Sequence, residues 1–461
     1  MINFSGASKT TYQTLRQSLV FIGDSITWGH GLTNQTQTIA YKIQQHINSR
    51  YTYTPATWGA SGAYDIVARN IMMDDTTNSP FNGGQFTSGP ILDISGATIA
   101  AAGVGIYPFS DATGNSTSVT IYSGWNDGAI TLEAGSITFT ANYPNTNNGY
   151  TLIGAMGAGK FQLLQGTTDL GTYTVGAIIT GTVSSGSATM TNVSITYGTV
   201  TTGSYLYTSG FPTGNSATTV SAYSGGSSLT MSTTSTIDGT YTFYSLAGVT
   251  QKFFIGPFSA NGSSSYSIKW IADLPVITML HPTTVYPTTY TTIQINARNS
   301  YGIADYSSIP NYPLTGENDV IAKEIMAMTL HDDTGITGGY ATRPTYIIST
   351  GINDIVARAI TPADYSTELT RLANALTNTG NTNHGRVILT VPLIPSSGWS
   401  TSLGTYGDYR KAIISVAKSL SLSYIDLSRL NLSGSDYIDG IHPNDAGTTK
   451  IAKYYISMLE L

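Results

Sequence analysis

Two patterns of hydrophobic and polar positions divide the chain. Towards both ends, short apolar runs alternate with segments in which apolar residues recur every three or four positions, as in a parallel sheet covered by helices. From about residue 76, stretches rich in Gly, Ser, Thr and Asn separate short runs of alternating apolar and polar residues, which are typical of an antiparallel sandwich or barrel. The first pattern predicts strands at 19–22, 51–58, 345–350, 387–391 and 423–427, and helices at 39–47, 63–73, 319–330, 362–377 and 406–420.

These patterns predict one α/β domain that is interrupted by a β-rich insertion. The α/β domain is expected over residues 15–80 and 290–461, after a polar lead-in at 1–14. The insertion is expected over 81–289, as an antiparallel sandwich or jelly-roll-like structure. Its alternating strands are predicted at 118–122, 136–140, 160–164, 251–255 and 265–271, and a further strand at 291–297.

A weak internal echo lies inside the insertion. The segment Gly-Ser-Ala-Thr-Met-Thr at 186–191 recurs as Ser-Ser-Leu-Thr-Met-Ser at 227–232. Two copies are too few for a solenoid, which needs three or more. The echo and the Thr/Ser-rich composition around it therefore indicate a small β-module at 178–238, nested within the insertion.

A strand, turn and helix near the amino end carry the first candidate for chemistry. The apolar run at 19–22 enters a Gly-Asp-Ser turn, which places the hydroxyl of Ser25 at the carboxyl edge of the sheet, where ligands bind in α/β folds. A serine is a weak nucleophile at neutral pH and requires a base that is oriented by a third group. Asp439 and His442, three residues apart across a turn, can supply that carboxylate and that imidazole.

Four motifs, in the same order, resemble those of the SGNH (GDSL-type) hydrolases. Gly-Asp-Ser-Ile-Thr at 23–27 matches the first motif, and Gly-Ile-Asn-Asp at 351–354 matches the third. Asp-Gly-Ile-His-Pro at 439–443 matches the last. The second motif, Asn-x-Gly-x-Ser-Gly, is matched by residues 57–62 with Thr57 in place of the asparagine.

The resemblance implies an esterase or deacylase on a flavodoxin-like α/β/α sandwich with a parallel sheet. It covers roughly residues 15–80 and 315–461 and does not extend to the insertion. By resemblance, Ser25 is the nucleophile, His442 the base and Asp439 the residue that orients it. The expected donors to the oxyanion are the backbone N–H groups of two residues and one side-chain amide, namely Ser25, Gly59 and Asn353.

One rival placement and three further contacts are open at this point. Residues 298–302, Arg-Asn-Ser-Tyr-Gly, also end a strand, and Asn299 contributes to the site if that turn faces it. Trp28 and Trp58 flank the expected site and either stack on a sugar or pack internally, and Asp354 is a third candidate for substrate binding. No histidine and glutamate stand at metal-ligand spacing, and the mechanism needs no cofactor.

The composition narrows the setting in which such a protein works. Charged residues make up only 10% of the chain, with a net charge of −6 and no basic run, which argues against a nucleic-acid partner. No apolar run is long enough to predict membrane insertion. Cysteine is absent and the amino end has no signal-peptide pattern. This composition, rich in Tyr, Thr and Ser and poor in charged residues, favours an extracellular or virion protein.

The leading hypothesis is a serine esterase that removes O-acetyl groups from a bacterial surface polysaccharide. The polar insertion and its likeness in composition to phage tail proteins suggest a tail spike or receptor-binding protein, with a homotrimer as the associated expectation. One alternative is a non-catalytic glycan-binding protein on a hydrolase scaffold. Another is a secreted lipase or thioesterase, against which the polar insertion counts.

Overall fold

Contacts divide the chain into two units. The first comprises residues 1–89, 284–308 and 318–461, and the second residues 90–283 and 309–317. The computed structural model describes residues 18–32, 37–50, 67–69, 91–93, 98–99, 105–110, 116–121, 130–131, 136–143, 149–208, 211, 218–258, 262–273, 276–283, 292–297, 302–303, 344–356, 360–378, 384–396 and 403–461.

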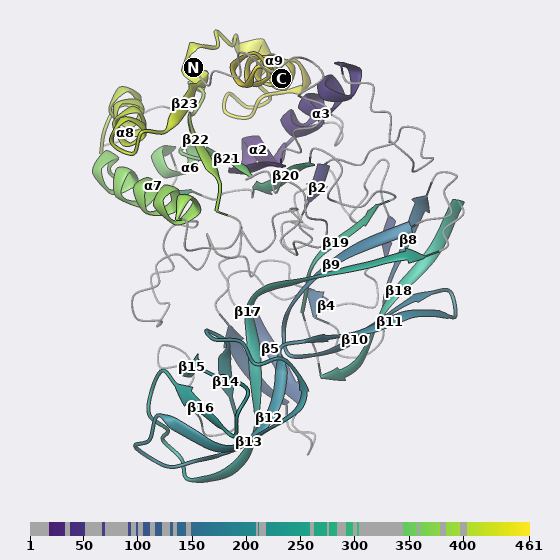
Figure 1. Ribbon diagram of the computed structural model, residues 1–461. Coiled ribbons are helices and arrows are strands. Elements are labelled where there is room, and N and C mark those ends of the chain that lie inside the picture. The colour runs from purple at the N-terminus through teal and green to yellow at the C-terminus, as the bar shows by residue number, and fades with distance from the viewer. Residues whose placement is uncertain are drawn as a thin grey trace. The chain divides into compact units, whose positions relative to one another are not determined.

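The first unit is built on a sheet of six parallel strands (Figure 1). These are β1 (Ser18–Gly23), β2 (Val67–Arg69), β20 (Thr292–Ala297), β21 (Thr345–Ser349), β22 (Arg386–Val391) and β23 (Ser423–Asp426). Their spatial order is β2-β20-β1-β21-β22-β23. Apart from the edge strand β2, this is the flavodoxin-like order, in which β1 lies between the next two strands of the fold.

Helices cover the sheet in two pairs. The helices are α2 (Ser25–Trp28), α3 (Ile39–Arg50), α6 (Ile352–Val356), α7 (Pro362–Thr377), α8 (Tyr406–Ser419) and α9 (Asp445–Leu459), with short 3-10 turns η5 (Leu427–Arg429) and η6 (Gly434–Asp436). Helix α3 packs on α9 and α7 packs on α8, and Figure 1 shows the two pairs on opposite sides of the sheet. Neighbouring residues determine where α7 starts. The side chain of Thr361 accepts the N–H of Asp364, and Pro362 is the first helical residue.

The register of the central strands brings three turns to one edge of the sheet. Gly23, the last residue of β1, is level with Ala297 of β20 on one side and with Ser349 of β21 on the other. Because these strands are parallel, the turns that follow them all leave at the carboxyl edge. The α/β rule places ligands at that edge, where the strand order reverses.

The amino-terminal part of the sheet differs from the sequence prediction. A helix is expected over 63–73, whereas residues Val67–Arg69 form strand β2, paired in parallel with β20. In a window this short, helical and strand spacing are hard to tell apart, and pairing with a neighbouring strand decides between them. The predicted strand at 51–58 and helix at 319–330 lie outside the described residues. The strand predicted at 291–297 is confirmed as β20, and its place is beside β1.

The second unit is antiparallel in every described ladder. Its strands are β3 (Ile91–Asp93), β4 (Thr98–Ile99), β5 (Gly105–Ser110), β6 (Ser116–Ile121), β7 (Ile130–Thr131), β8 (Ser136–Tyr143), β9 (Gly149–Gly157), β10 (Gly159–Gln165), β11 (Thr168–Val175), β12 (Ala177–Val183), β13 (Thr189–Gly198), β14 (Tyr205–Tyr207), β15 (Thr218–Ala222), β16 (Ser228–Met231), β17 (Gly239–Phe258), β18 (Gly262–Asp273) and β19 (Val276–Thr283). They form sheets of five strands (β11-β10-β18-β8-β3), ten strands (β12-β13-β16-β15-β14-β17-β9-β19-β7-β4) and two strands (β5-β6).

Part of the ten-stranded sheet closes into a small barrel. The run β12-β13-β16-β15-β14-β17 returns to its start because β17 also pairs with β12. Its interior is filled by apolar side chains, including Met190, Met231 and Phe243. The two echoed segments lie next to each other in it, with Met190 opposite Leu229. Closure leaves these strands without a free edge, which protects a small, polar β-module from pairing with other chains.

The predicted fold class is confirmed. A flavodoxin-like parallel α/β sheet is interrupted by a large antiparallel β-rich region. Among the helices that the structure describes, none combines the length and the apolar character needed to cross a bilayer.

Candidate active site

The turn after β1 presents the hydroxyl of Ser25 at the amino end of α2. Asp24 caps this short helix, because its carboxylate accepts the N–H of Ile26 at 3.1 Å. Gly23 is required before the cap, since a Cβ there would lie 2.9 Å from the carbonyl oxygen of Ser349 on β21. The helix ends at Gly29 in the left-handed conformation (φ 91°), which costs least for glycine. Ser25 is 2% exposed, so its position is set by its surroundings.

His442 and Asp439 meet Ser25 from the other end of the chain. The Nε2 atom of His442 lies 2.8 Å from Oγ of Ser25. Its Nδ1 atom lies 2.7 Å from Oδ2 of Asp439. The three residues that the sequence predicts to act together are thus joined by two hydrogen bonds in series. In this arrangement the imidazole can take the hydroxyl proton through Nε2 while the carboxylate holds Nδ1–H.

Asp439 is held in its charged form by the loop it belongs to. Its Oδ1 accepts the backbone N–H groups of Ile441 and His442, at 2.9 and 2.8 Å. Partial burial opposes ionisation, but these donors and the contact with the His442 side chain outweigh it and lower the pKa of Asp439 to about 2. Asp439 is therefore a carboxylate at neutral pH, and it can stabilise an imidazolium at His442.

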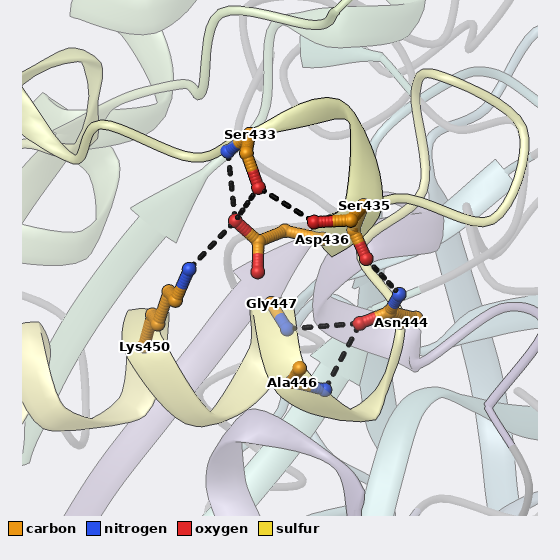
Figure 2. A network of polar contacts seen from close by, with 7 residues as sticks. All are labelled: Ser433, Ser435, Asp436, Asn444, Ala446, Gly447 and Lys450. Carbon is orange, nitrogen blue, oxygen red and sulfur yellow. Dashed lines mark hydrogen bonds and ion pairs between the residues drawn. The ribbon is translucent and has the colours of Figure 1, made fainter.

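A polar network holds the loop 437–443 on the side of α9 (Figure 2). The buried carboxylate of Asp436 accepts both the N–H and the hydroxyl of Ser433, and its Oδ2 lies 2.7 Å from Nζ of Lys450. Asn444 caps α9 by accepting two N–H groups, and it donates to the carbonyl of Ser435 at 2.7 Å. The loop is thus anchored just before residue 437 and just after residue 443, which limits how far the imidazole can move.

A second set of contacts holds the same loop towards β22. The carbonyl of Gly440 accepts the N–H of Ser396 at 2.9 Å. The hydroxyl of Tyr437 donates to the carbonyl of Ile394 at 2.7 Å. An antiparallel bridge between Tyr437 and Pro443 closes the loop on itself. Loops are usually mobile. These bonds restrain the loop and so help to keep His442 within hydrogen-bond distance of Ser25.

The turn after β21 brings Asn353 to the same edge and links it to the turn after β20. Asn353 lies in α6 and is partly exposed, whereas Asp354 is fully buried. Both oxygens of Asp354 accept the N–H of Ile303, at 2.8 Å each. Asp354 is thus a buried carboxylate that links the two turns through the backbone of Ile303, and the expectation that it contacts substrate stays a prediction.

Gly302 is the residue at this edge that sequence reasoning missed. It lies so close to Asp354 that a Cβ at this position would overlap the Oδ1 atom. Strand β20 pairs with β1, but residues 298–301 lie outside the described residues, so the rival placement of Asn299 stays a prediction. Only the pairing of β20 with β1 could have pointed to Gly302, and a local sequence pattern does not reveal that pairing.

The remaining predicted residues are not placed by the structure. Gly59, Trp58, Thr57 and Asn299 lie outside the described residues, as does the side chain of Trp28, whose backbone ends α2. Their roles stay predictions.

Burial raises the pKa of Asp24 to about 6, although the N–H of Ile26, the charge of His442 and the N–H of Ile352 oppose the shift. Because the folded pKa is above the ordinary aspartate value of 3.8, protonation stabilises the fold fully below pH 3.8, and this stabilisation is lost as the pH rises through about 6.

We expect Asp24→Asn, which keeps a good helix cap, to gain on the order of 2–3 kcal/mol relative to the wild type between pH 4 and pH 7. Urea unfolding of both proteins across this range measures the difference. A difference that stays constant with pH would contradict the raised pKa.

Sequence comparison finds an esterase that is similar to a short segment of this chain. No protein-family model matches it. A multidomain esterase of Ruminococcus flavefaciens is 34% identical over 83 residues, which is 17% of this chain and 11% of the relative. The matched segment thus spans about a tenth of that protein's length.

Solved structures are similar at low sequence identity. A peptidoglycan O-acetylesterase is 12% identical with a TM-score of 0.39, over 96% of this chain and 91% of that chain. An acetyl xylan esterase is 19% identical with a TM-score of 0.26, over 37% of this chain and 83% of that chain. All three similar proteins are named as esterases.

Proposed function

We propose that this protein is a serine esterase that acts through an acyl-enzyme. The observation that carries the proposal is the pair of hydrogen bonds from Ser25 to His442 and from His442 to Asp439, at 2.8 and 2.7 Å. In the first half-reaction, Ser25 Oγ attacks the ester carbonyl carbon and its proton passes to Nε2 of His442. The tetrahedral intermediate collapses, the C–O bond to the alcohol breaks, and His442 protonates the departing oxygen.

Water completes the second half-reaction. It attacks the acyl carbon while His442 accepts its proton, and the bond to Ser25 breaks as that proton returns to Oγ. The products are the free acid and the regenerated enzyme. Asp439 remains ionised throughout, since its pKa is about 2, and it stabilises the imidazolium that forms twice in each cycle.

The oxyanion needs hydrogen-bond donors at the same edge of the sheet. We propose the backbone N–H of Ser25 at the start of α2 and the side-chain amide of Asn353 as two of them. For the third donor we favour the N–H of Gly302, because Asp354 ties its turn to the turn of Asn353. Gly59 remains the alternative for this third donor.

For the substrate we propose an acetyl ester of a carbohydrate, namely an O-acetylated bacterial surface polysaccharide. The β-rich unit supports this with a surface of uncharged polar residues, on which the exposed Asn192 and Thr240 are each hydrogen-bonded to the partly exposed Thr182. Carbohydrate esters also appear in the names of the similar acetylesterases. An extracellular or virion location, on a phage tail, and a homotrimeric assembly belong to the same proposal.

Hydrolysis of p-nitrophenyl esters of increasing acyl length tests the reaction class and separates it from its rivals. We expect acetate to be cleaved at least ten times faster, in kcat/KM, than octanoate, about 1.4 kcal/mol in transition-state binding. Release of acetate from O-acetylated polysaccharide, measured enzymatically, then tests the substrate class. A preference for octanoate would instead favour a lipase, and binding of the glycan without any ester cleavage would favour a non-catalytic protein.

A further inference from the structure

A second histidine lies against the proposed catalytic base. The ring of His30 packs on the ring of His442, with centroids 4.5 Å apart and planes tilted by 48°. The backbone N–H of His30 donates to the carbonyl of Ser25 at 2.9 Å. His30 is therefore fixed to the nucleophile's own residue at one end and to the imidazole at the other. The two segments it connects are 417 positions apart in the sequence.

The next residue makes a second contact with the same loop. Gly31 has a left-handed backbone (φ 72°), and a Cβ there would lie 2.6 Å from Cδ1 of Ile438. Ile438 immediately precedes Asp439 and is 49% exposed. Together, His30 and Gly31 are the place where the nucleophile turn packs on the loop 437–443.

We propose that His30 and Gly31 are positioning residues, which hold the imidazole of His442 in the plane required for proton transfer from Ser25. The proposal rests on the esterase function proposed above. The two hydrogen bonds of His442 are made by the two nitrogens of its ring. They do not prevent the ring from rotating about the axis that joins these bonds. The ring of His30, packed against it at a tilt of 48°, restricts that motion, and aromatic pairs of this kind are stabilising at such separations.

The position of the loop makes this support necessary. Asp439 has 47% of its side chain exposed and His442 has 16%, so one side of the pair faces solvent rather than protein. Proton transfer depends steeply on alignment, and small misplacements of catalytic groups cost large factors in rate. Packing by His30 therefore acts on the chemical step rather than on substrate binding.

Three single variants test the role of the His30 ring in the full-length protein. We expect His30→Ala to lower kcat for p-nitrophenyl acetate about tenfold, with KM changed less than twofold. His30→Phe, which keeps a flat ring, should restore kcat to within about threefold of the wild type. The matched control is His46→Phe, because His46 lies on α3 and contacts the carbonyl of Leu461 instead. An unchanged kcat in His30→Ala, or a His30→Phe variant as slow as His30→Ala, would overturn the role of ring packing.

Gly31 is tested by a double-variant cycle with Ile438. We expect Gly31→Ala to lower kcat about tenfold, because its Cβ displaces Ile438 and the residue after it. Removing the obstacle with Ile438→Ala should recover several-fold of this loss in the double variant, while the strain of the positive φ remains. Additive losses in the double variant would show that Gly31 acts through its own backbone alone, which contradicts the contact.

A spectroscopic measurement keeps this inference separate from the proposed reaction. In proton NMR, the Nδ1–H of His442 that is bonded to Asp439 should give a sharp downfield signal in the wild type and in Ser25→Ala. We expect His30→Ala to broaden or shift it, and His30→Phe and His46→Phe to preserve it. If no ester is cleaved by the wild type but the signal responds in this way, the reaction fails and the positioning role stands. A signal that is identical in His30→Ala overturns the positioning role whatever the activity.

Discussion

Ser25→Ala and His442→Ala are each expected to lower kcat for an acetyl ester by about 10⁴-fold or more, the largest effects that this structure predicts. The hydroxyl of Ser25 is the atom that bonds to the acyl group, and without Nε2 of His442 it cannot give up its proton at neutral pH. KM should change little, because neither change removes a group that holds the alcohol portion of the substrate. Stopped-flow measurement of p-nitrophenol release gives both constants.

The double variant Ser25→Ala/His442→Ala makes this prediction sharper. Residues that act as one unit lose their contribution together, so the double variant should be no slower than the slower single variant. Ser419→Ala and His46→Ala are matched controls, since these residues contact backbone carbonyls of α8 and of the carboxyl end. All variants should keep the wild-type circular dichroism spectrum. Losses that multiply in the double variant, or activity that either single variant retains, would remove the catalytic assignment.

The parts of the fold that could be predicted are those set by local chemistry. Helix α7 begins at Pro362 and ends at Thr377 as predicted, because Thr361 caps it and its apolar residues recur on one face. Strands β21 and β22 were predictable for a related reason, since strands buried on both faces are continuous apolar runs. In each case the signal lies within a dozen residues of the element itself.

The parts that could not be predicted depend on pairing across the chain. Nothing in the residues around Val67 says that they will pair with β20, and so a strand was predicted as a helix. The same limit hid the contact of Gly302 with Asp354, since the two residues come from different strand–turn units. The closed barrel is a third case, because its closure depends on β17 pairing with β12.

The candidate site shows the same division. Motif order brought Ser25, Asp439 and His442 into one hypothesis, and the structure places all three within hydrogen-bond distance. Burial, however, is a property of the whole fold, so a motif could not show that Asp354 is buried and bound to the backbone of Ile303. The role of His30 could not be predicted for the same reason, because the ring it packs against comes from the other end of the chain.

Asn353→Ala is expected to lower kcat by roughly 10²–10³-fold, the usual cost of losing one oxyanion donor. Asn353 follows β21, which lies beside β1, and this partly exposed residue lies at the same edge of the sheet as Ser25. A neutral amide that donates to a developing negative charge acts mainly in the transition state, so KM should stay within about threefold. Steady-state kinetics with p-nitrophenyl acetate measures both constants.

Two further variants distinguish this donor role from a structural one. Asn353→Asp preserves size and shape but replaces the donor by a negative charge, so it should be at least as slow as Asn353→Ala. Asn374→Ala, at an exposed position of α7, is the matched control and should keep wild-type kinetics. If Asn353→Asp retained activity, the site would not require a donor at this position. A loss confined to KM would instead place Asn353 in substrate binding, because uniform binding of substrate and transition state leaves kcat unchanged.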